Sequence, residues 1–459
     1  MKLMGQQYDK IHEIIEVISQ NKGRALLVGG AVRDMVLGLL LKDIDIEVYG
    51  LSQSQLESIL QKFGHVNLVG KSFGVLRVSG LDADWSLPRV DSSGRKPTVE
   101  VDPFMSIEIA ARRRDLTMNA MLFDMITGEL IDPCNGIDDI KKKVLRTPDA
   151  RFFIQDPLRF YRVMQFIARF EMIPDDELNA LCAEMDITSI SRERIEEEFK
   201  KMFLYAQRPS LGIRWVHKIG RLSDVLPELA ATVGIKQNPQ WHPEGDVFEH
   251  TMQSLDAAAV IAQSYDKEFD KLILLYAALC HDLGKVTTTK MVNGVLKSIG
   301  HEKESKRLAC LLMKRITHNS DLINAVGCLV LHHMAPLQFV RNKAKLPAYK
   351  RLANKLVHNV TMLMLIDLCS ADRQGRNDTG HEPLKDNFSD LMVFKQKVEQ
   401  AGVSTGRIDP LLKGADLLDI LSPGPQMGKL LTYAYEKQLA EDISDKAILK
   451  KHVIKKMKK

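Results

Sequence analysis

The stretch Leu26–Val36 (LLVGGAVRDMV), followed closely by Lys42–Ile46 (KDIDI), decides the fold of the N-terminal region. A short apolar run ends in two glycines, a helical pattern follows, and a second strand then carries Asp43 and Asp45. Side chains alternate faces along a strand, so these two carboxylates point the same way. Two carboxylates beside a Gly-Gly turn are typical of a site that holds Mg²⁺ next to a triphosphate. The alternative is a tight strand-to-helix turn followed by a solvated acidic strand end.

Three further stretches narrow this choice. Leu81–Arg89 (LDADWSLPR) predicts a neighbouring strand that carries Asp84, with Asp82 as the alternative in a register shifted by two residues. Ala110–Met121 (AARRRDLTMNAM) places three arginines before an aspartate, and Ile154–Arg162 (IQDPLRFYR) opens a helix with Asp and Pro at its start. In this order, the four stretches resemble the head and neck of the class II tRNA nucleotidyltransferases. These are the CCA-adding enzymes, with the bacterial poly(A) polymerases as close relatives.

The resemblance implies a role for each head residue. Asp43 and Asp45 would bind Mg²⁺, and Asp84 would complete that catalytic site beside the RNA 3′-hydroxyl. The alternative for Asp84 is an ordinary exposed strand acid. The family's triphosphate cradle, and its Arg-Arg-Asp element that contacts the triphosphate and the ribose, correspond here to Gly29, Gly30, Arg33, Arg113, Arg114 and Asp115.

Three neighbouring residues have less certain assignments. Arg112 adds a third arginine to the Arg-Arg-Asp element, so the choice of the two that carry its role depends on alignment. Asn119 is either a core amide or a ribose contact. Asp34 is expected to orient Arg33 rather than to bind metal.

The neck carries the residues that the resemblance assigns to nucleotide selection. Asp156 and Arg159 match the Asp and Arg of a Glu-Asp-x-x-Arg element that presents hydrogen bonds to the incoming C or A. Gln155 replaces the usual Glu, which leaves relaxed specificity or partial CCA addition as alternatives. Asp156 also suits an N-cap, and Arg162, one turn beyond Arg159, is expected to reach phosphates.

A second constellation follows between residues 242 and 376. A lone histidine is usually structural, but the ordered set of histidines and aspartates resembles an HD-type metal phosphohydrolase domain. By the family pattern, one divalent metal (Mg²⁺, Mn²⁺, Ni²⁺ or Fe) is bound by His250, His281, Asp282 and Asp372. His301 and His333 would help to hold a second metal, and Lys285 would meet a phosphate. The alternative is an HD domain that binds metal without turnover.

The predicted fold class is α+β, with a polymerase-beta-like head built on a mixed sheet and all-helical parts after it. Apolar runs at 25–28, 44–48 and 75–78 predict strands, and strand patterns nearly vanish after Asp156. We expect four domains: a nucleotidyltransferase head at 1–148, a helical neck and body at 149–235, an HD domain at 236–380 and a helical extension at 381–459. The extension ends in a lysine-rich segment, which is either an RNA contact or a solvated tail.

Composition is consistent with such an enzyme. The 459 residues are 45% hydrophobic, enough for two to four domains with sizeable cores. The net charge of +5 permits a nucleic-acid partner without requiring one. No apolar run approaches the ~20 residues that span a bilayer, and no secretory signal is recognised, so no membrane partner is expected. The six cysteines lack CxxC spacing and read as free thiols in a reducing cytoplasm.

The predicted function is template-independent addition of CCA to the 3′ end of tRNA from CTP and ATP, with Mg²⁺ in the head. The HD domain is expected to hydrolyse phosphomonoesters or 2′,3′-cyclic phosphates. Alternatives are a poly(A) polymerase, a CC- or A-adding enzyme, and an HD phosphohydrolase with a nucleotide-sensing head. The oligomeric state stays open between monomer and dimer.

Overall fold

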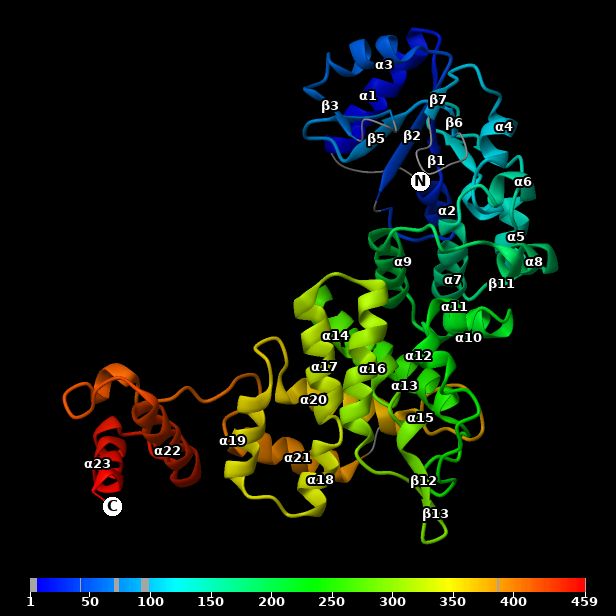
Figure 1. The fold of residues 1–459 in the computed structure, drawn as a ribbon. Helices are drawn as coiled ribbons and strands as arrows, with labels where there is room; N and C mark the ends of the chain where they lie inside the picture. Colours follow the sequence, from blue (N-terminus) through cyan, green and yellow to red (C-terminus); the bar gives the residue numbers. More distant parts are fainter. Residues whose placement is uncertain (1–5, 42, 70–73, 92–98, 386–387, 459) are drawn as a thin grey trace. The chain divides into compact units, whose positions relative to one another are not determined.

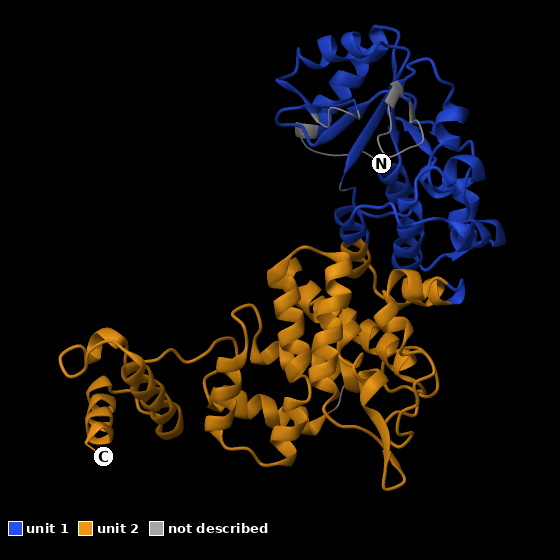
Figure 2. Cartoon of the chain, viewed as in Figure 1, with its two compact units in different colours: residues 1–198, 218–220 blue, residues 199–217, 221–459 orange. Residues whose placement is uncertain are grey.

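The computed structural model describes residues 6–41, 43–69, 74–91, 99–385 and 388–458. The chain divides into two compact units, one of residues 1–198 and 218–220 and one of residues 199–217 and 221–459 (Figure 2). The first contains a large mixed sheet, and the second is mostly helical (Figure 1). An α+β class with a sheet-containing head and helical remainder is thereby confirmed.

The first unit is organised around a seven-stranded sheet of order β3-β4-β5-β2-β1-β8-β9. β2 and β5 are parallel, and all other neighbours are antiparallel. The predicted strands at 25–28, 44–48 and 75–78 are confirmed as β1, β2 and β4. The strands are β1 (Arg24–Val28), β2 (Ile44–Tyr49), β3 (Val66–Val69), β4 (Val75–Val78), β5 (Ala83–Ser86), β8 (Leu122–Asp124) and β9 (Leu130–Ile131).

The predicted neighbouring strand that carries Asp84 is confirmed as β5, but it covers Ala83–Ser86 rather than residues 81–89. β5 ends at Ser86, and Arg89 begins a separate antiparallel ribbon of β6 (Arg89–Asp91) with β7 (Val99–Val101). Pro88, which has no backbone N–H to donate, lies in the break. Asp84 lies inside β5, whereas Asp82 precedes it.

Strand β2 separates a core face from a polar face. Ile44, Ile46 and Val48 are at most 5% exposed and belong to the main hydrophobic cluster of this unit. Helix α1 (Gln6–Gln20), which packs against β1, contributes a stripe of four isoleucines to the same cluster. Burial of each such side chain contributes roughly 1.5–3 kcal/mol. The core therefore fixes the register of β2, and with it the face on which Asp45 lies.

The remaining elements of the first unit are short helices and one small strand pair. A parallel pair joins β10 (Val144–Leu145) to β11 (Ile173–Pro174). The helices are α2 (Gly30–Val36), α3 (Gln53–Leu60), α4 (Ile107–Arg112), the 3-10 turn η1 (Thr117–Asn119), α5 (Gly136–Lys142), α6 (Ala150–Phe153), α7 (Leu158–Phe170), α8 (Asp176–Glu184) and α9 (Arg192–Tyr205), whose second half belongs to the other unit.

The second unit is a helical assembly. Its helices are α10 (Ser210–Lys218), α11 (Leu222–Val225), α12 (Pro227–Ala230), α13 (Val247–Ala262), α14 (Glu268–Cys280), α15 (Lys285–Thr288), α16 (His301–Ile316), α17 (Ser320–His332), α18 (Ala335–Arg341), α19 (Leu346–Lys355), α20 (Met362–Gln374), α21 (Ser389–Gln400), η2 (Gly414–Leu417), α22 (Pro425–Glu441) and α23 (Lys446–Met457). α13, α14, α16, α17 and α20 pack against one another and form its centre.

One hairpin interrupts these helices, in a part of the chain that was predicted to be all-helical. β12 (Thr289–Val292) pairs with β13 (Val295–Ser298) across a two-residue turn of Asn293 and Gly294. Both turn residues have positive φ, 51° and 74°, as the favoured hairpin turn requires. The Asn-Gly pair between two apolar dipeptides was the pattern in the sequence that predicts this hairpin.

Ser320–Arg341 is long and apolar enough to cross a membrane by length and composition, contrary to the expectation that no stretch would be. However, 56% of its most apolar window is buried inside the unit, and the stretch consists of α17 and α18 with a turn between them. Burial among other helices is typical of a core segment, which is apolar for the same physical reason as a membrane span.

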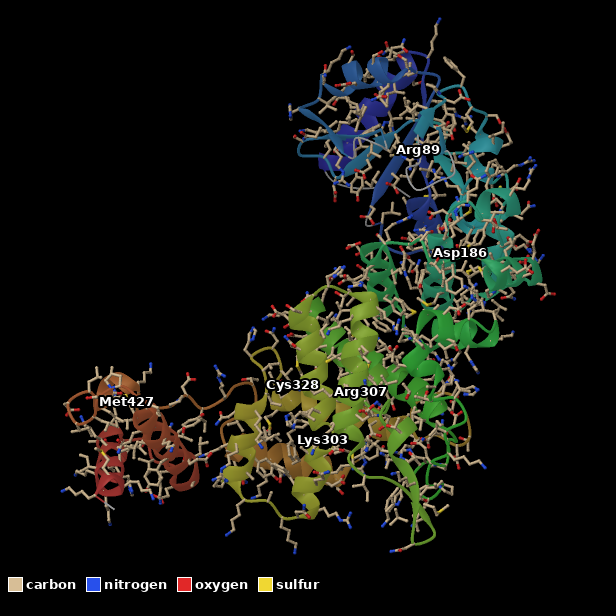
Figure 3. The ribbon with its side chains drawn as sticks, in the orientation of Figure 1. Arg89, Asp186, Lys303, Arg307, Cys328 and Met427 are labelled. Carbon is tan, nitrogen blue, oxygen red and sulfur yellow. The ribbon has the colours of Figure 1, made fainter. Side chains whose placement is uncertain are left out.

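The C-terminal segment has a small core of its own. Met427 on α22 (labelled in Figure 3), Leu430 and Ala434 pack with Leu417 of η2 and Val453 of α23. On the charged side of α23, Lys446 and Lys450 pair with acidic residues of the η2 region. Part of the lysine-rich tail is thus already neutralised within the segment.

Candidate active sites

The polar face of β2 carries the predicted head carboxylates. In the parallel register of β2 and β5, Asp45 lies beside Asp84, and Asp43 directly precedes β2. Burial raises the pKa of Asp45, Arg114 opposes that rise, and the nearby charges of Asp84 and Asp43 add to it. The three carboxylates therefore share one electrostatic environment, which a divalent cation with oxygen ligands would stabilise. Asp82 lies outside β5 and is exposed.

Asp84 has a protein partner already. Both of its carboxylate oxygens accept hydrogen bonds from Arg77, its neighbour on β4. Among the described residues, the clusters with three ligand atoms within 4.8 Å lie between His242 and Asp372, and none lies in the head. The carboxylates of Asp43, Asp45 and Asp84 therefore do not form such a three-ligand cluster in this state.

The Gly-Gly turn lies at the adjoining strand end. β1 runs antiparallel to β2 with Leu27 opposite Ile46, so the end of β1 meets the start of β2. Gly29 has a φ of 66°, a conformation that a side chain disfavours. A Cβ there would also lie 3.2 Å from Nη1 of Arg114. Glycine therefore lets the Arg114 guanidinium lie directly against the turn, beside the carboxylates.

Glu47 holds Arg114 in this place. Its Oε1 lies 3.5 Å from Nη2 of Arg114, and its Oε2 accepts a 2.6 Å hydrogen bond from the Tyr49 hydroxyl. Burial and the adjacent Glu47 carboxylate raise the pKa of Tyr49. Sequence reasoning missed Glu47, although its spacing of two from Asp45 places it on the same strand face.

Arg33 lies inside the protein and points away from solvent. Its Nε and Nη2 donate to Oδ1 of Asp34 at 2.8 and 2.7 Å, so the predicted contact between Arg33 and Asp34 is present. Nη1 donates to Oδ1 of Asn119 at 2.9 Å, and the guanidinium lies over the rings of Phe166 and Phe170. Arg33 thereby links α2, which begins at Gly30, to α7. These contacts stabilise the adjacent Gly29–Gly30 turn.

A buried polar chain continues from Asn119 into the neck. Asn119 donates to Asp115, which also accepts a 2.6 Å hydrogen bond from Nε of Arg162. Burial alone would raise the pKa of Asp115, but Arg162 and Asn119 lower it to about 2. Asp115 and Arg162 therefore form a structural ion pair in this state, and Asn119 is a satisfied core amide.

The residues predicted to select the nucleotide have partners within the protein. Arg159 donates from Nη1 to the carbonyl of Phe152 at 2.9 Å and from Nη2 to the carbonyl of Arg113 at 2.6 Å. Asp156 pairs with Arg194 at 3.0 Å, and its Oδ1 accepts from the N–H of Leu158. Asp156 lies one residue before the N-cap position of α7, which Pro157 occupies, so the expected N-cap position is wrong by one residue. Gln155 is exposed and is not among the hydrogen-bond acceptors of Arg159. Arg112 is exposed at the end of α4, whereas the Arg113 guanidinium lies over the Phe152 ring.

The second unit gathers its histidines and aspartates into one buried cluster. Two sets of three residues each place ligand atoms within 4.8 Å of one another: His250 with His281 and Asp372, and Asp282 with His301 and His333. All six residues are at most 6% exposed. Helix α16 contributes one of these residues. His301 lies at the start of its buried face, whereas Lys303 and Arg307 lie on its exposed face (Figure 3).

The orientation of the four imidazoles is that of metal ligands. Each Nδ1 lies 2.7–3.0 Å from a backbone carbonyl oxygen, of Gly375, Ala278, Ser298 and Val330 respectively for His250, His281, His301 and His333. If each Nδ1 donates, the Nε2 atoms are lone-pair donors, and they face one another in pairs at 3.3 Å (His250 and His281) and 3.1 Å (His301 and His333). Burial and neighbouring imidazoles lower the pKa of His333 to about 3. Against the effect of burial, Asp372 and Glu244 raise the pKa of His250 to about 9, and Asp282 raises that of His301, so these two imidazoles favour the protonated form unless a bound cation displaces the proton.

The comparisons with known proteins agree with both parts of the chain. Residues 25–146 match the Poly A polymerase head domain family, and residues 247–372 match the HD domain family. The multifunctional CCA protein of Methylobacillus flagellatus is 33% identical over 401 residues, which cover 84% of this chain and 93% of that protein. The multifunctional CCA protein of Stenotrophomonas maltophilia is 31% identical, with 90% and 98% covered. The chain belongs to the multifunctional CCA protein family.

As a member of the multifunctional CCA protein family, the chain is a tRNA nucleotidyltransferase that carries an HD domain. Solved structures share its fold. The Thermotoga maritima CCA-adding enzyme complexed with tRNA covers 99% of this chain and 96% of its own, with a TM-score of 0.61 and 19% identity. A CCA-adding enzyme with CTP covers 100% and 97%, with a TM-score of 0.66 and 18% identity. Head and HD domains of this kind typically bind divalent metals.

In this multifunctional CCA protein, two residues beside the HD cluster escaped sequence reasoning. Glu244 Oε1 lies 2.7 Å from Nδ1 of His250 and 2.9 Å from Nδ1 of His242, and the three form a further possible ligand group. His242 and Glu244 lie in the segment WHPEG, which precedes α13. Two titratable residues eight and six positions before His250 were the available indication. His332 lies outside all three groups.

The cations around the HD cluster have carboxylate partners. Lys285 Nζ lies 2.7 Å from Asp282 and donates to Gln237 at 2.6 Å, and Arg376 donates to Asp372 at 2.8 Å. Despite burial, these cations and the adjacent histidines hold the pKa of Asp282 and Asp372 well below the usual range. Both carboxylates are therefore ionised, as metal ligation requires.

Replacing Arg33 with methionine tests its structural role. Asp34 would be left charged and partly buried, and the amide of Asn119 would lose its donor. Loss of one partner of a buried ion pair costs about 3–5 kcal/mol, so urea denaturation should show that loss in the unfolding of the head. Arg151→Met is the control, because Arg151 forms only an exposed ion pair with Asp149 and should change stability little. Equal losses in the two variants would contradict the assignment.

Proposed function

We propose that this protein adds C and A nucleotides to the 3′ end of tRNA, using CTP and ATP and no template. The observation that supports this most directly is that three features lie together at the ends of neighbouring inner strands of the sheet. Asp45 lies in register with Asp84, Asp43 precedes the strand, and the Gly29 turn with Arg114 adjoins them. This is the donor set that nucleotidyl transfer requires, in a chain of the multifunctional CCA protein family.

In the proposed reaction, the tRNA 3′-hydroxyl attacks the α-phosphorus of the nucleoside triphosphate and pyrophosphate leaves. Asp43, Asp45 and Asp84 would hold Mg²⁺, and two such ions supply activation of the hydroxyl and stabilisation of phosphate charge. For Asp84 this requires release of Arg77 from its carboxylate. Arg114, set by Glu47 against Gly29, is placed to meet the triphosphate, and the backbone of the turn can approach phosphate oxygens. Arg33 and Asp115 would act by holding this framework.

The decisive assay combines the purified protein with tRNA transcripts that lack one, two or three terminal nucleotides, and with labelled CTP or ATP. Addition of C, C and A, and then a stop, is the expected result. Long A tracts on arbitrary RNA would instead indicate a poly(A) polymerase, and termination after CC a partial enzyme. Absence of any incorporation with Mg²⁺ would overturn the proposal.

Asp156 and Arg159 are proposed to read the incoming base. At most three of the five guanidinium N–H groups of Arg159 are used by carbonyls, which leaves donors for a base edge. Asp156 keeps carboxylate lone pairs beyond those that Arg194 and Leu158 occupy. In place of the family Glu, backbone carbonyls hold Arg159, which makes a neutral Gln155 tolerable. Arg162, paired with Asp115, would contribute charge toward phosphates.

Arg159→Ala should blur nucleotide choice more than it weakens triphosphate binding. Loss of a bidentate base contact removes about 1–3 kcal/mol of discrimination, so misincorporation of UTP and GTP should rise about 5- to 150-fold. The measurement is kcat/KM for each of the four nucleotides on tRNA that lacks its last residue. Arg151→Ala, an exposed arginine of α6, is the control. A large rise in KM for CTP and ATP without misincorporation would contradict the base-reading role.

We further propose that the HD domain is a metal-dependent phosphohydrolase for phosphomonoesters or 2′,3′-cyclic phosphates. His250, His281, Asp282 and Asp372 would hold a divalent ion (Mg²⁺, Mn²⁺ or Ni²⁺), with His301 and His333 toward a second; such ions supply a water nucleophile near neutral pH. Lys285 would meet substrate phosphate. The proposed domain limits are 1–148, 149–235, 236–380 and 381–459, and the proposed location is the cytoplasm.

A further inference from the structure

A cavity of about 640 Å³ opens in front of the HD cluster, and its walls extend well beyond it. Asp282, His301, His333 and Asp372 line its inner part. The outer part is formed by the loop that carries Trp241 and His242, by the β12–β13 hairpin and by α18. Hydrolysis of a small phosphate ester requires only the inner part of the cavity. The outer walls can therefore contact other parts of a larger ligand.

Trp241 is the most conspicuous residue of the outer wall. Of the three tryptophans of the chain, Trp85 and Trp215 are 0% and 5% exposed, whereas Trp241 is 60% exposed. Ile299, which follows the hairpin and also lines the cavity, is 75% exposed. Large apolar side chains that border a polar cavity are typical of ligand sites, where they contact the apolar part of the ligand.

Trp241 also lies one residue from the catalytic end of the cavity. Its neighbour His242 places Nε2 3.4 Å from Nζ of Lys285, and that Nζ lies 2.7 Å from Asp282. A ligand that extends from Trp241 to the cluster would place a flat ring at one end and a phosphate at the other, as a nucleotide does.

The charged side chains of the inner and outer parts of the cavity differ in whether they have partners. In the inner part, Lys285, Arg373 and Arg376 are each paired with an aspartate. At the rim, Lys297 on β13 and Arg341 on α18 are exposed, and within the described part of the chain no carboxylate is recorded as their partner. Two unneutralised cations outside the metal cluster favour a ligand with further negative charge beyond the reacting phosphate.

From this arrangement we infer that the rim is a subsite for the 3′-terminal part of a single-stranded RNA. Trp241 stacks on the terminal base, and Lys297 and Arg341 bind the phosphodiester that precedes it. Base stacking on an aromatic side chain is sequence-tolerant, because every base has a π-face. The inference rests on the proposed hydrolase only in assigning the reacting phosphate to the metal cluster; the binding itself does not depend on turnover.

Binding is measured first, by tryptophan fluorescence of the full-length, Mn²⁺-loaded protein. The probe is a diadenosine dinucleotide with a 3′-phosphate, and ribose 5-phosphate is the base-free comparison. The dinucleotide should quench fluorescence saturably, because Trp241 is the exposed tryptophan. Trp241→Phe should remove the quenching signal yet retain affinity in a filter-binding assay, whereas Trp241→Ala should weaken affinity about 5- to 150-fold. Unchanged affinity in Trp241→Ala would overturn the stacking role.

The rim cations are tested by Lys297→Ala combined with Arg341→Ala. Affinity should fall for the dinucleotide and should stay unchanged for adenosine 3′-phosphate, which lacks the preceding phosphodiester. Lys303→Ala is the matched control, since Lys303 is exposed on α16 and does not line the cavity. Equal losses for both ligands, or an equal loss in the control, would contradict a phosphodiester contact.

Hydrolysis of the same compounds separates this inference from the proposed function. Trp241→Ala should lower kcat/KM for the dinucleotide and leave that for ribose 5-phosphate unchanged. Saturable quenching without any hydrolysis by the natural sequence would refute the hydrolase but keep the subsite. Hydrolysis of both compounds with no quenching, and with no effect of Trp241→Ala, would refute the subsite but keep the hydrolase.

Discussion

Replacing Asp43 and Asp45 together with alanine is expected to abolish nucleotide addition and to leave HD phosphohydrolysis intact. Both carboxylates lie near the start of β2, next to the end of β1 and beside β5. The change removes two of the three carboxylate groups proposed to bind Mg²⁺. A loss of metal-stabilised charge in the transition state amounts to at least about 4 kcal/mol, or roughly 10³-fold in rate. The measurement is CTP incorporation into tRNA that lacks its 3′ end.

A matched control is available on the next strand. Asp82→Ala removes an exposed acid two residues from Asp84 but outside β5, so incorporation should change little. If Asp82→Ala lowered incorporation as much as the double variant, the assignment by strand register would be wrong. If the double variant also lost phosphohydrolysis while its circular dichroism stayed native, two independent sites would be wrong.

The converse experiment combines His281→Ala with Asp282→Ala. It removes a ligand from each three-residue set of the cluster, so hydrolysis of phosphate esters should disappear while CCA addition continues. A second readout does not depend on turnover. Metal bound only by the folded state raises stability by RT ln(1 + [L]/Kd), about 2.7 kcal/mol at a hundredfold excess over Kd. The natural sequence should therefore show a rise in Tm with Mn²⁺ or Ni²⁺, and the double variant should not.

His332→Ala is the control for this cluster. His332 is the sequence neighbour of His333, but it lies outside the three groups whose ligand atoms converge. Hydrolysis and the metal-dependent rise in Tm should both persist in this variant. Their loss in His332→Ala, or a persisting Tm rise in the double variant, would contradict the ligand assignment.

Strands and core of the head were predictable because the decisive pattern is local. Alternation along Ile44–Tyr49 and the i, i+3, i+4 spacing of the α1 isoleucines both follow from the periodicity of a single element. The break at Pro88 and the Asn-Gly hairpin had equally local indications that were passed over. Both features follow from the local conformational preferences of Pro, Asn and Gly and do not depend on tertiary packing.

Partners that depend on the folded chain were not predictable in the same way. Arg33 follows a Gly-Gly turn and suggests a phosphate ligand, yet the structure buries it against Phe166 and Phe170, more than 130 residues away. Arg159 is likewise held by main-chain carbonyls that no side-chain pattern reveals. Glu244 lies beside His250 because its loop folds back onto α13. Motif order pointed to both candidate sites, whereas tertiary packing determines which of their residues are buried in structural contacts.

The alternating faces of β2 have a consequence for how this head can diverge. Even-numbered positions from Ile44 to Val48 supply the core, and odd-numbered positions from Asp45 to Tyr49 carry the polar side chains. An insertion of a single residue within the strand would exchange the two sets, placing acidic side chains in the hydrophobic core and isoleucines on the polar face. Insertions or deletions in β2 are therefore tolerable only if they involve an even number of residues. This requirement restricts how the strand can change in evolution, in addition to the restriction on residue type.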